Sequence, residues 1–418
     1  MDGQAAATRY ESLDAIRGVA VMGILAMNIV AFALPFQAYA NPAAGGPPGS
    51  ADVATWFFNF VLVDSKMRGL FSMLFGASTL LVIDSAASAG RSAAGAHYSR
   101  MVWLALFGLA HFYLIWFGDI LFLYAICGLL LFLFRNLSVK ALLLWSIPFF
   151  LIGIGLPASL WSMLSMAQAG TLPPEAATGM QEALAQMNAD MGPSTPAYAK
   201  EMALYLGSYS SIVAHRTGEM GGDPIFFLSM FLWETIGLML IGMALFKSRM
   251  LTGEWEAARY RKWALICFLI AAPPLAGLAV YQMRTGYDAV AIFGSTIALS
   301  IPFDTLMTVG WAALIMLLIQ TRASAAVRAR LAAAGRMAFT NYLVTSIVMT
   351  TIFYGYGLGL FGSVGRLPLY LFCFGMWAAM LLWSKPWLER YHYGPLEWLW
   401  RSLSRWRVQP MKKVAAAQ

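Results

Sequence analysis

The sequence predicts an all-α, polytopic integral membrane protein with about ten transmembrane helices, five before and five after one extracytoplasmic helical insertion. Two observations predict this fold class. Of the 418 residues, 60% are hydrophobic and only 11% are charged, whereas a soluble domain of this length carries about twice that charged fraction. Several runs are almost free of charge, and each exceeds the roughly 17 residues that a helix needs to cross a bilayer core.

Ten apolar segments are the predicted spans, and the second and ninth are either long for one span or broken. They divide the chain into an N-terminal membrane half (1–163), an insertion or lid (164–223) and a C-terminal membrane half (224–418) that ends in a cytoplasmic amphipathic tail. The insertion is too short to be a catalytic domain on its own. In chain order, the spans are 16–36, 53–83, 101–117, 120–134, 141–163, 224–246, 263–281, 296–320, 337–361 and 367–384.

The basic residues set the predicted orientation. Of the 28 Lys and Arg residues, about 21 fall in segments on the side of both termini, about four on the side of the insertion and about three within spans, which by the positive-inside rule places both termini in the cytoplasm. The formal charge of +8 does not indicate nucleic-acid binding, because no basic run lies on a soluble domain. The three cysteines lie in apolar segments without Cys/His spacing, so no metal site is predicted.

The first span carries Asp14, Arg17 and Asn28. An ionisable side chain in hydrocarbon costs several kcal/mol, so it normally faces a partner or a water-filled cavity. Asp14 and Arg17 are three residues apart and therefore neighbours on a helix. Asn28 returns to nearly the same face about 21 Å further along. This pattern fits a functional polar face, and it equally fits a capping ion pair with an interhelical Asn hydrogen bond.

The second span holds three ionisable residues near mid-depth: Asp64, Lys66 and Arg68. Asp64 and Arg68 are four residues apart and can neutralise each other on one helix, which leaves Lys66 in need of another acid. Glu234 in the sixth span and Asp304 in the eighth lie at similar depths and are the candidates. These groups form either a buried structural ion-pair network or a wet internal site.

The third span ends near His111, and Asp119 follows in the tight turn before the fourth span. Histidine titrates near neutrality and can accept a proton from an alcohol or an amine. A carboxylate can orient its other ring nitrogen, as in catalytic triads. The alternative is that His111 makes an ordinary interhelical hydrogen bond.

Several motifs spread over nearly the whole chain resemble those of YeiB-like membrane proteins, a family that carries a C-terminal domain of unknown function. The resemblance implies a bacterial inner-membrane protein with several membrane spans. The motifs are 9–18 (RYESLDAIRG), 70–76 (LFSMLFG), 118–121 (GDIL), 335–338 (GRMA), 340–342 (TNY) and 394–398 (GPLEW).

The N-terminal Leu-Asp-x-x-Arg-Gly pattern is also similar to two groups of transmembrane acyltransferases, the bacterial acyltransferase-three enzymes and the lysosomal heparan glucosamine N-acetyltransferases. These enzymes move acyl groups from cytoplasmic acyl-CoA to acceptors beyond the membrane. Fourteen residues after the Asp of this pattern, the first group has a His and the second an Asn. Here Asn28 stands at that position, as in the second group, which leaves His111 as the intramembrane imidazole.

The leading hypothesis is therefore a transmembrane acyltransferase that moves an acyl group, most simply acetyl, from cytoplasmic acyl-CoA to an extracytoplasmic sugar, glycan or lipid. His111 is the expected general base, Asp119 orients it or binds the acceptor, and Asn28 stabilises the developing oxyanion. The residues expected to bind the donor are Asp14, Arg17 and Arg336 at the cytoplasmic mouth, and Lys66 and Arg68 along the acyl passage.

A rival hypothesis is a secondary transporter or exporter of a small anion or lipid, because internal charged residues serve an ion-coupled carrier equally well. A non-catalytic scaffold or sensor is the third. The expected partners are membrane lipids, acyl-CoA and the acceptor, and no nucleic acid. The sequence leaves the oligomeric state open, a homodimer included.

Overall fold

The structure is a computed structural model that describes residues 10–191 and 195–413, apart from the side chain of Ala176. This part of the chain forms helices, with one isolated bridge between Tyr391 and Lys412 and no strand. The predicted all-α fold is confirmed. The first membrane half contains α1 (Glu11–Ala33), α2 (Phe36–Ala40), α3 (Ser50–Leu62), α4 (Lys66–Ser88), α5 (Ala93–Leu114), α6 (Leu121–Leu131), the 3-10 turn η1 (Phe132–Phe134) and α7 (Val139–Gln168).

The insertion forms three helices, and the second membrane half follows directly. The insertion helices are α8 (Pro174–Met191), α9 (Pro196–Tyr205) and α10 (Tyr209–Thr217). The helices of the second half are α11 (Asp223–Lys247), α12 (Ala257–Arg284), α13 (Ala289–Phe293), η2 (Gly294–Leu299), α14 (Ile301–Thr321), α15 (Ala325–Arg336), α16 (Ala338–Phe353), α17 (Arg366–Arg390) and α18 (Pro395–Ser404).

Within the described residues, seven helical segments are long and apolar enough to cross a membrane. They are Glu11–Ala33, Ser50–Ser88, Val139–Gln168, Asp223–Lys247, Ala257–Arg284, Ile301–Thr321 and Arg366–Arg390. Three shorter apolar segments, Leu121–Phe134, Ala289–Leu299 and Ala338–Phe353, accompany them. Each of the ten predicted spans falls on one or more of the observed helices. The chain is thus a multi-pass membrane protein, and the count of ten spans stays a prediction.

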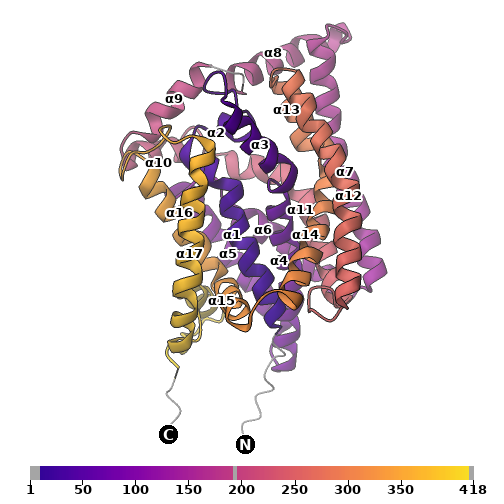
Figure 1. Cartoon of the computed structure of the whole chain (residues 1–418), viewed down its shortest axis with the longest axis vertical. Helices are drawn as coiled ribbons and strands as arrows, with labels where there is room; N and C mark the ends of the chain where they lie inside the picture. Colours follow the sequence, from indigo (N-terminus) through magenta and orange to yellow (C-terminus); the bar gives the residue numbers. More distant parts are fainter. Residues whose placement is uncertain (1–9, 192–194, 414–418) are drawn as a thin grey trace, which may run out of the picture.

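The described chain begins and ends at the same end of the bundle (Figure 1), and α8 and α9 lie across the opposite end. We call the end that holds the start of α1 and the last turns of α17 the terminal end. We call the end that holds α8, α9 and α10 the insertion end. This arrangement agrees with the predicted placement of both termini on one side and the insertion on the other.

The first helix packs closely against α15, although almost 300 residues separate them in the chain. A Cβ atom at Gly18 would lie 2.2 Å from the carbonyl oxygen of Leu331, and one at Gly335 would lie 1.9 Å from that of Asp14. No other residue fits at these contacts without separating the helices, because the neighbouring atoms belong to backbone. Two glycines of the sequence motifs therefore fix how the first and second halves of the chain join.

The second predicted span is broken into α3 and α4. Between them, Ser65 has a φ of 64°, in the left-handed region that most residues avoid. Two side chains satisfy carbonyl groups freed at the break: Lys66 Nζ donates to Phe60 O at 2.5 Å and Trp311 Nε1 donates to Leu62 O at 2.8 Å. Non-helical backbone at membrane depth is tolerated where protein groups satisfy it in this way.

The eighth predicted span is also interrupted. Residues Gly294–Leu299 form a π-helical segment between α13 and α14. Such segments are rare and often occur at functional sites. Trp161 of α7 packs against this segment, because a Cβ atom at Gly294 would lie 2.2 Å from its indole nitrogen. The two interrupted spans contribute residues to the same cavity, which is described below.

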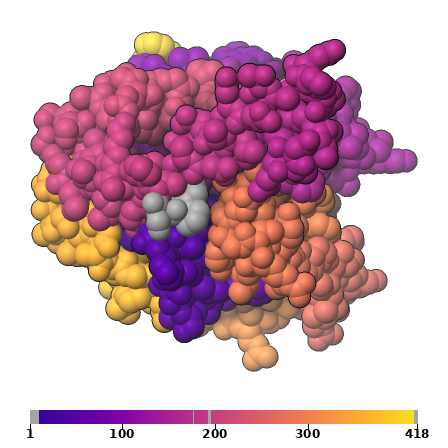
Figure 2. All heavy atoms as spheres, turned by 90° about the horizontal axis from the view of Figure 1, so that it is seen from above, coloured from indigo at the N-terminus to yellow at the C-terminus, as the bar shows by residue number. Residues whose placement is uncertain are grey.

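Helix α9 anchors the insertion to both membrane halves. Gly355 N donates to Tyr205 O at 2.8 Å, and the rings of Tyr205 and Tyr354 lie 4.6 Å apart. Phe36 N, at the start of α2, donates to Glu201 Oε1 at 3.0 Å. Figure 2 shows the insertion spread over one part of this face, with the segment around α2 and α3 visible beside it. The insertion therefore forms a partial cover.

Candidate functional site

A cavity of about 210 Å³ lies between α1, α2, the α5–α6 connection, α11 and the η2–α14 segment. It extends from Phe36 and Pro224 at the insertion end down to Glu234, which is roughly 16 Å along α11 from its first residue. Most of its wall is apolar. Its ionisable or otherwise polar lining residues are Asn28, Tyr39, Ser65, Arg68, Asp119, Glu234, Thr296 and Asp304.

His111 and Asp119 form a buried pair at the wall of this cavity. His111 Nδ1 lies 2.9 Å from Asp119 Oδ1, and both side chains are buried. The second carboxylate oxygen accepts a hydrogen bond from Phe122 N at 2.8 Å, which caps the start of α6. The α5–α6 turn thus holds the carboxylate in place, as the sequence predicts. Asp119 lines the cavity, whereas His111 lies behind it.

The other imidazole nitrogen, His111 Nε2, is buried without a hydrogen-bond partner among the described residues. A carboxylate can only accept a hydrogen bond, so a neutral His111 donates its Nδ1–H to Asp119 and carries its lone pair on Nε2. A buried nitrogen with a free lone pair is suited to accepting a proton from a substrate. The pair therefore has the geometry of the base and the orienting acid of a catalytic triad.

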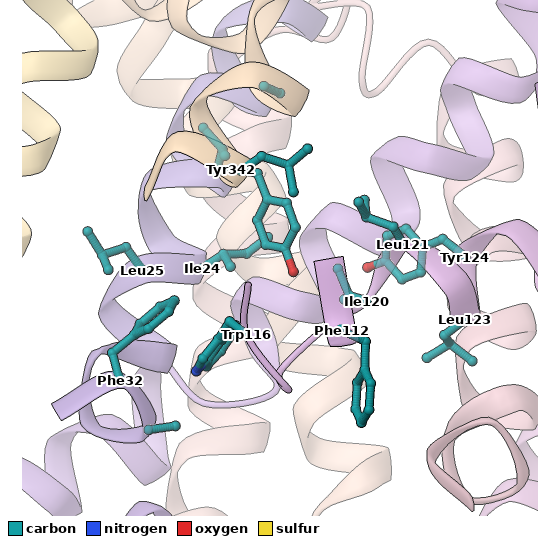
Figure 3. Close-up of a cluster of buried hydrophobic side chains, with 14 of the residues drawn as sticks. Ile24, Leu25, Phe32, Phe112, Trp116, Ile120, Leu121, Leu123, Tyr124 and Tyr342 are labelled. Atoms are coloured by element: carbon teal, nitrogen blue, oxygen red, sulfur yellow. The ribbon is translucent and has the colours of Figure 1, made fainter. Parts of the chain in front are cut away.

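Two aromatic side chains surround the imidazole. The ring of Tyr342 in α16 lies 5.1 Å from that of His111, and its hydroxyl donates to Gly118 O at 3.2 Å. Trp116 packs edge-on against His111 at 6.3 Å and stacks on Phe32 at 3.9 Å. Figure 3 shows Tyr342 reaching from α16 toward Trp116 and Ile120. These contacts exclude water from the imidazole.

Asn28 lines two neighbouring cavities. It lines the main cavity together with Asp119, and it lines a second cavity of about 10 Å³ together with Tyr342. Asn28 and Asp119 therefore line the same cavity, and His111 lies behind Asp119. The sequence placed Tyr342 in the 340–342 motif but did not indicate its contact with His111, because its helix follows His111 by more than 200 residues.

Two ion pairs form the deep part of the site. Arg68 Nη2 lies 2.8 Å from Glu234 Oε2, and Lys66 Nζ lies 2.6 Å from Asp304 Oδ1. The predicted pairing of Asp64 with Arg68 is wrong, because Asp64 lies in the break before α4 and not on the same helix. Arg68 Nη1 is buried without a hydrogen-bond partner among the described residues, although Arg68 lines the cavity.

The remaining predicted donor-binding residues lie away from the cavity. Arg17 contacts Asp14 at 2.9 Å and Ser78 at 2.8 Å, and Asp14 is about 21 Å from Asn28 along α1. Arg336 donates to His392 O at 3.2 Å. These three residues are at the terminal end, near one another in the fold but not among the lining residues of the cavity. Arg9, which begins the first motif, is outside the described residues.

Comparison with known proteins identifies the family. Residues 245–407 match the family model described as "Protein of unknown function (DUF418)". The chain is 32% identical to "Uncharacterized protein YeiB" of Escherichia coli (strain K12), over 95% of this chain and 96% of that protein. It is 30% identical to "Uncharacterized protein YxaH" of Bacillus subtilis (strain 168), over 97% and 96%. No solved structure matches. The chain therefore belongs to the family of YeiB-like membrane proteins with a DUF418 region.

Proposed function

We propose that this protein is a transmembrane acyltransferase that moves an acyl group from cytoplasmic acyl-CoA to an extracytoplasmic sugar, glycan or lipid. The observation that carries the proposal is the buried His111–Asp119 pair, with its unpartnered Nε2, beside a cavity that extends toward the insertion end. In this proposal the terminal end faces the cytoplasm of a bacterial inner membrane, because the basic residues concentrate there.

The reaction uses three side chains. His111 Nε2 accepts the proton of the acceptor hydroxyl or amine while the acceptor atom attacks the thioester carbonyl of the donor. The side-chain amide of Asn28 donates a hydrogen bond to the developing oxyanion. The carbon–sulfur bond then breaks, and the thiol of CoA leaves with the proton from the imidazolium. Asp119 stabilises the imidazolium through Nδ1 throughout.

The proposal requires two movements. The donor would be held at the terminal end by Arg17 and Arg336, so its acyl group must pass along the α1–α4 interface to the cavity. Arg68 lines this cavity, whereas Lys66, at the start of α4, is not among the lining residues. In addition, Asp119 and not His111 forms the cavity wall, so the α5–α6 connection must move to admit the acceptor to Nε2. Movements of such loops are common in enzymes that exclude water from a reaction.

A secondary transporter or exporter of a small anion or lipid is the second candidate, and one observation favours it. The α3–α4 and α13–α14 breaks both border the cavity, and each carries an ion pair beside it. Interrupted helices with charged residues near the bilayer midplane are typical substrate sites of secondary transporters. Such a carrier would need no general base, so the His111–Asp119 pair would then be structural.

The test uses the full chain in liposomes made from a lipid extract of its native membrane. Acetyl-CoA is supplied, and the release of free CoA thiol is measured for wild type, His111→Gln and His97→Gln. His111→Gln keeps much of the volume and hydrogen bonding but cannot act as the base, so turnover should fall by roughly 10²–10⁴-fold.

His97 is the matched control, because it is also a buried histidine of α5 and contacts Gly128 O through Nε2 at 2.7 Å. His97→Gln should therefore leave turnover within a few-fold of wild type. Normal turnover by a folded His111→Gln protein would show that His111 only packs. Proton-coupled flux without any acyl-CoA turnover would support the transporter instead.

A further inference from the structure

Arginine side chains gather at the terminal end, around α18 and the first two turns of α5. Arg100 on α5 is repelled electrostatically by Arg401, Arg405 and Arg17, and Arg405 is in turn repelled by Arg401 and Arg91. Burial and these neighbouring cations lower the pKa of Arg405. Like charges that face one another repel, and an anion bound among them would lower this repulsion. We call Arg91, Arg100, Arg401 and Arg405 the basic cluster.

The described chain offers the basic cluster no acid. Across residues 10–191 and 195–413, none of the ion pairs joins one of its four arginines to a carboxylate. Glu397, the acidic residue of α18, instead accepts hydrogen bonds from Thr340 N at 3.0 Å and Thr340 Oγ1 at 2.5 Å. No described carboxylate therefore neutralises these four arginines.

Aromatic rings hold the guanidinium groups in place. Arg100 Cζ lies 4.0 Å from the ring centroid of Trp400, and Arg401 Cζ lies 4.5 Å from that of Tyr393. A stacked guanidinium keeps its N–H groups directed outward in one plane, where they can contact phosphate oxygens at two points. Trp400 Nε1 donates to Arg100 O at 3.0 Å, which ties α18 to α5.

Exposed apolar side chains border the basic cluster. Trp406 is 80% exposed and Val408 is 75% exposed just after α18. On α5, Val102 is 56% exposed and Leu106 is 50% exposed, within two turns of Arg100. Trp103 and Trp406 contact each other, with ring centroids 5.9 Å apart. A surface that is basic at the end of a helix and apolar along it matches a phospholipid, with its headgroup at the arginines and its acyl chains on α5.

We propose that the basic cluster is a binding site for an anionic phospholipid, whose headgroup phosphate lies between α18 and the start of α5. The lipid supplies the negative charge that the described chain lacks there, and its acyl chains cover the exposed face of α5. The site is at the terminal end, whereas the cavity extends toward the insertion end, and it does not depend on the proposed acyl transfer.

The test measures lipid binding to the full chain, purified in an uncharged detergent, by native mass spectrometry. The probes are cardiolipin, phosphatidylglycerol and phosphatidylcholine. Wild type should bind the two anionic lipids about tenfold or more tightly than phosphatidylcholine. R401Q/R405Q should lose about thirtyfold in affinity for them, the scale expected for two basic side chains at a membrane surface. R401K/R405K, which keeps both charges, should retain most of the preference for the anionic lipids.

The matched control is R261Q/K262Q, which removes the same charge from two exposed side chains at the start of α12. It should bind anionic lipids as wild type does. Equal losses in the control and in R401Q/R405Q, or no preference for anionic lipids in wild type, would overturn the proposal. In the last experiment, acetyl-CoA is added to the protein with bound lipid. If it displaces the lipid and R401Q/R405Q loses its binding, the cluster takes nucleotide phosphates and the lipid assignment is wrong.

Discussion

Lys66 and Asp304 illustrate how individual charges are held in the apolar interior. Their side chains are 2% and 5% exposed, and Nζ lies 2.6 Å from Oδ1. Lys66 also donates to Phe60 O, so one side chain neutralises an acid and satisfies the end of α3. A buried pair of this kind costs desolvation energy that the attraction only partly offsets. Its value lies in joining α4 to α14 across the second and eighth predicted spans.

A double-mutant cycle tests this role. Lys66→Met leaves Asp304 buried without its partner, so the free energy of unfolding should fall by about 3–5 kcal/mol. Asp304→Leu should be destabilising for the same reason, whereas the double variant should recover much of the loss. Thermal unfolding in detergent measures all three against wild type. Additive effects of the two substitutions would show that the two side chains are not coupled.

Part of the site could be predicted from residue identity and spacing. The sequence indicated that His111 would meet Asp119, because a tight turn brings residues on either side of it together, and it indicated Glu234 and Asp304 as the acids for the second span. The error at Asp64 has a local cause: helical spacing does not apply across the break at Ser65. The 340–342 motif contains Tyr342, but its contact with His111 could not be predicted, because no short-range pattern shows which distant helix covers an imidazole.

Several motif residues determine how neighbouring helices pack and take no part in the proposed reaction. Gly18 and Gly335 are glycines because α1 and α15 lie in backbone contact. Gly76 and Gly242 play the same role between α4 and α11, where added Cβ atoms would lie 2.1 and 1.9 Å from backbone oxygens of the partner helix. The sequence predicted where the helices lie but not these pairings, since hydrophobic runs do not indicate which helices are neighbours.

The contact between α9 and α2 should depend on pH. Burial raises the pKa of Glu201 from its usual 4.5 to about 7, although hydrogen bonds from Phe36 N and Gln37 oppose the shift. The folded state therefore favours the protonated carboxyl. Its contribution to stability is fully present below pH 4.5 and is lost as the pH rises through 7.

Glu201→Gln tests this contact, because the amide stays neutral and can still accept the hydrogen bond from Phe36 N. The variant and wild type should unfold at nearly the same temperature at pH 5, and the variant should be the more stable of the two at pH 8. Limited proteolysis of the insertion should show the same order. A temperature difference that does not change between pH 5 and pH 8 would contradict the burial of this carboxyl.

At the scale of the whole molecule, the two predicted halves are interleaved. The first helix packs against α15, and α4 packs against α11, so the main cavity is built from both halves. The termini and the insertion lie at opposite ends (Figure 1). The distribution of the basic residues predicted that the termini and the insertion lie at opposite ends. It could do so because this distribution depends on orientation in the membrane and not on which helices pair.

If the protein transfers acyl groups across the membrane, the donor must be supplied at the cytoplasmic face and the product must appear at the other face. Sealed membrane vesicles are prepared with either the cytoplasmic or the extracytoplasmic face outward, and acetyl-CoA labelled in the acetyl group is added outside. Labelled lipid or glycan should accumulate only in vesicles with the cytoplasmic face outward, inside their lumen, and His111→Gln should abolish it. Label transfer from the extracytoplasmic face, or no transfer in either orientation while the same vesicles carry out proton-coupled flux, would contradict the account.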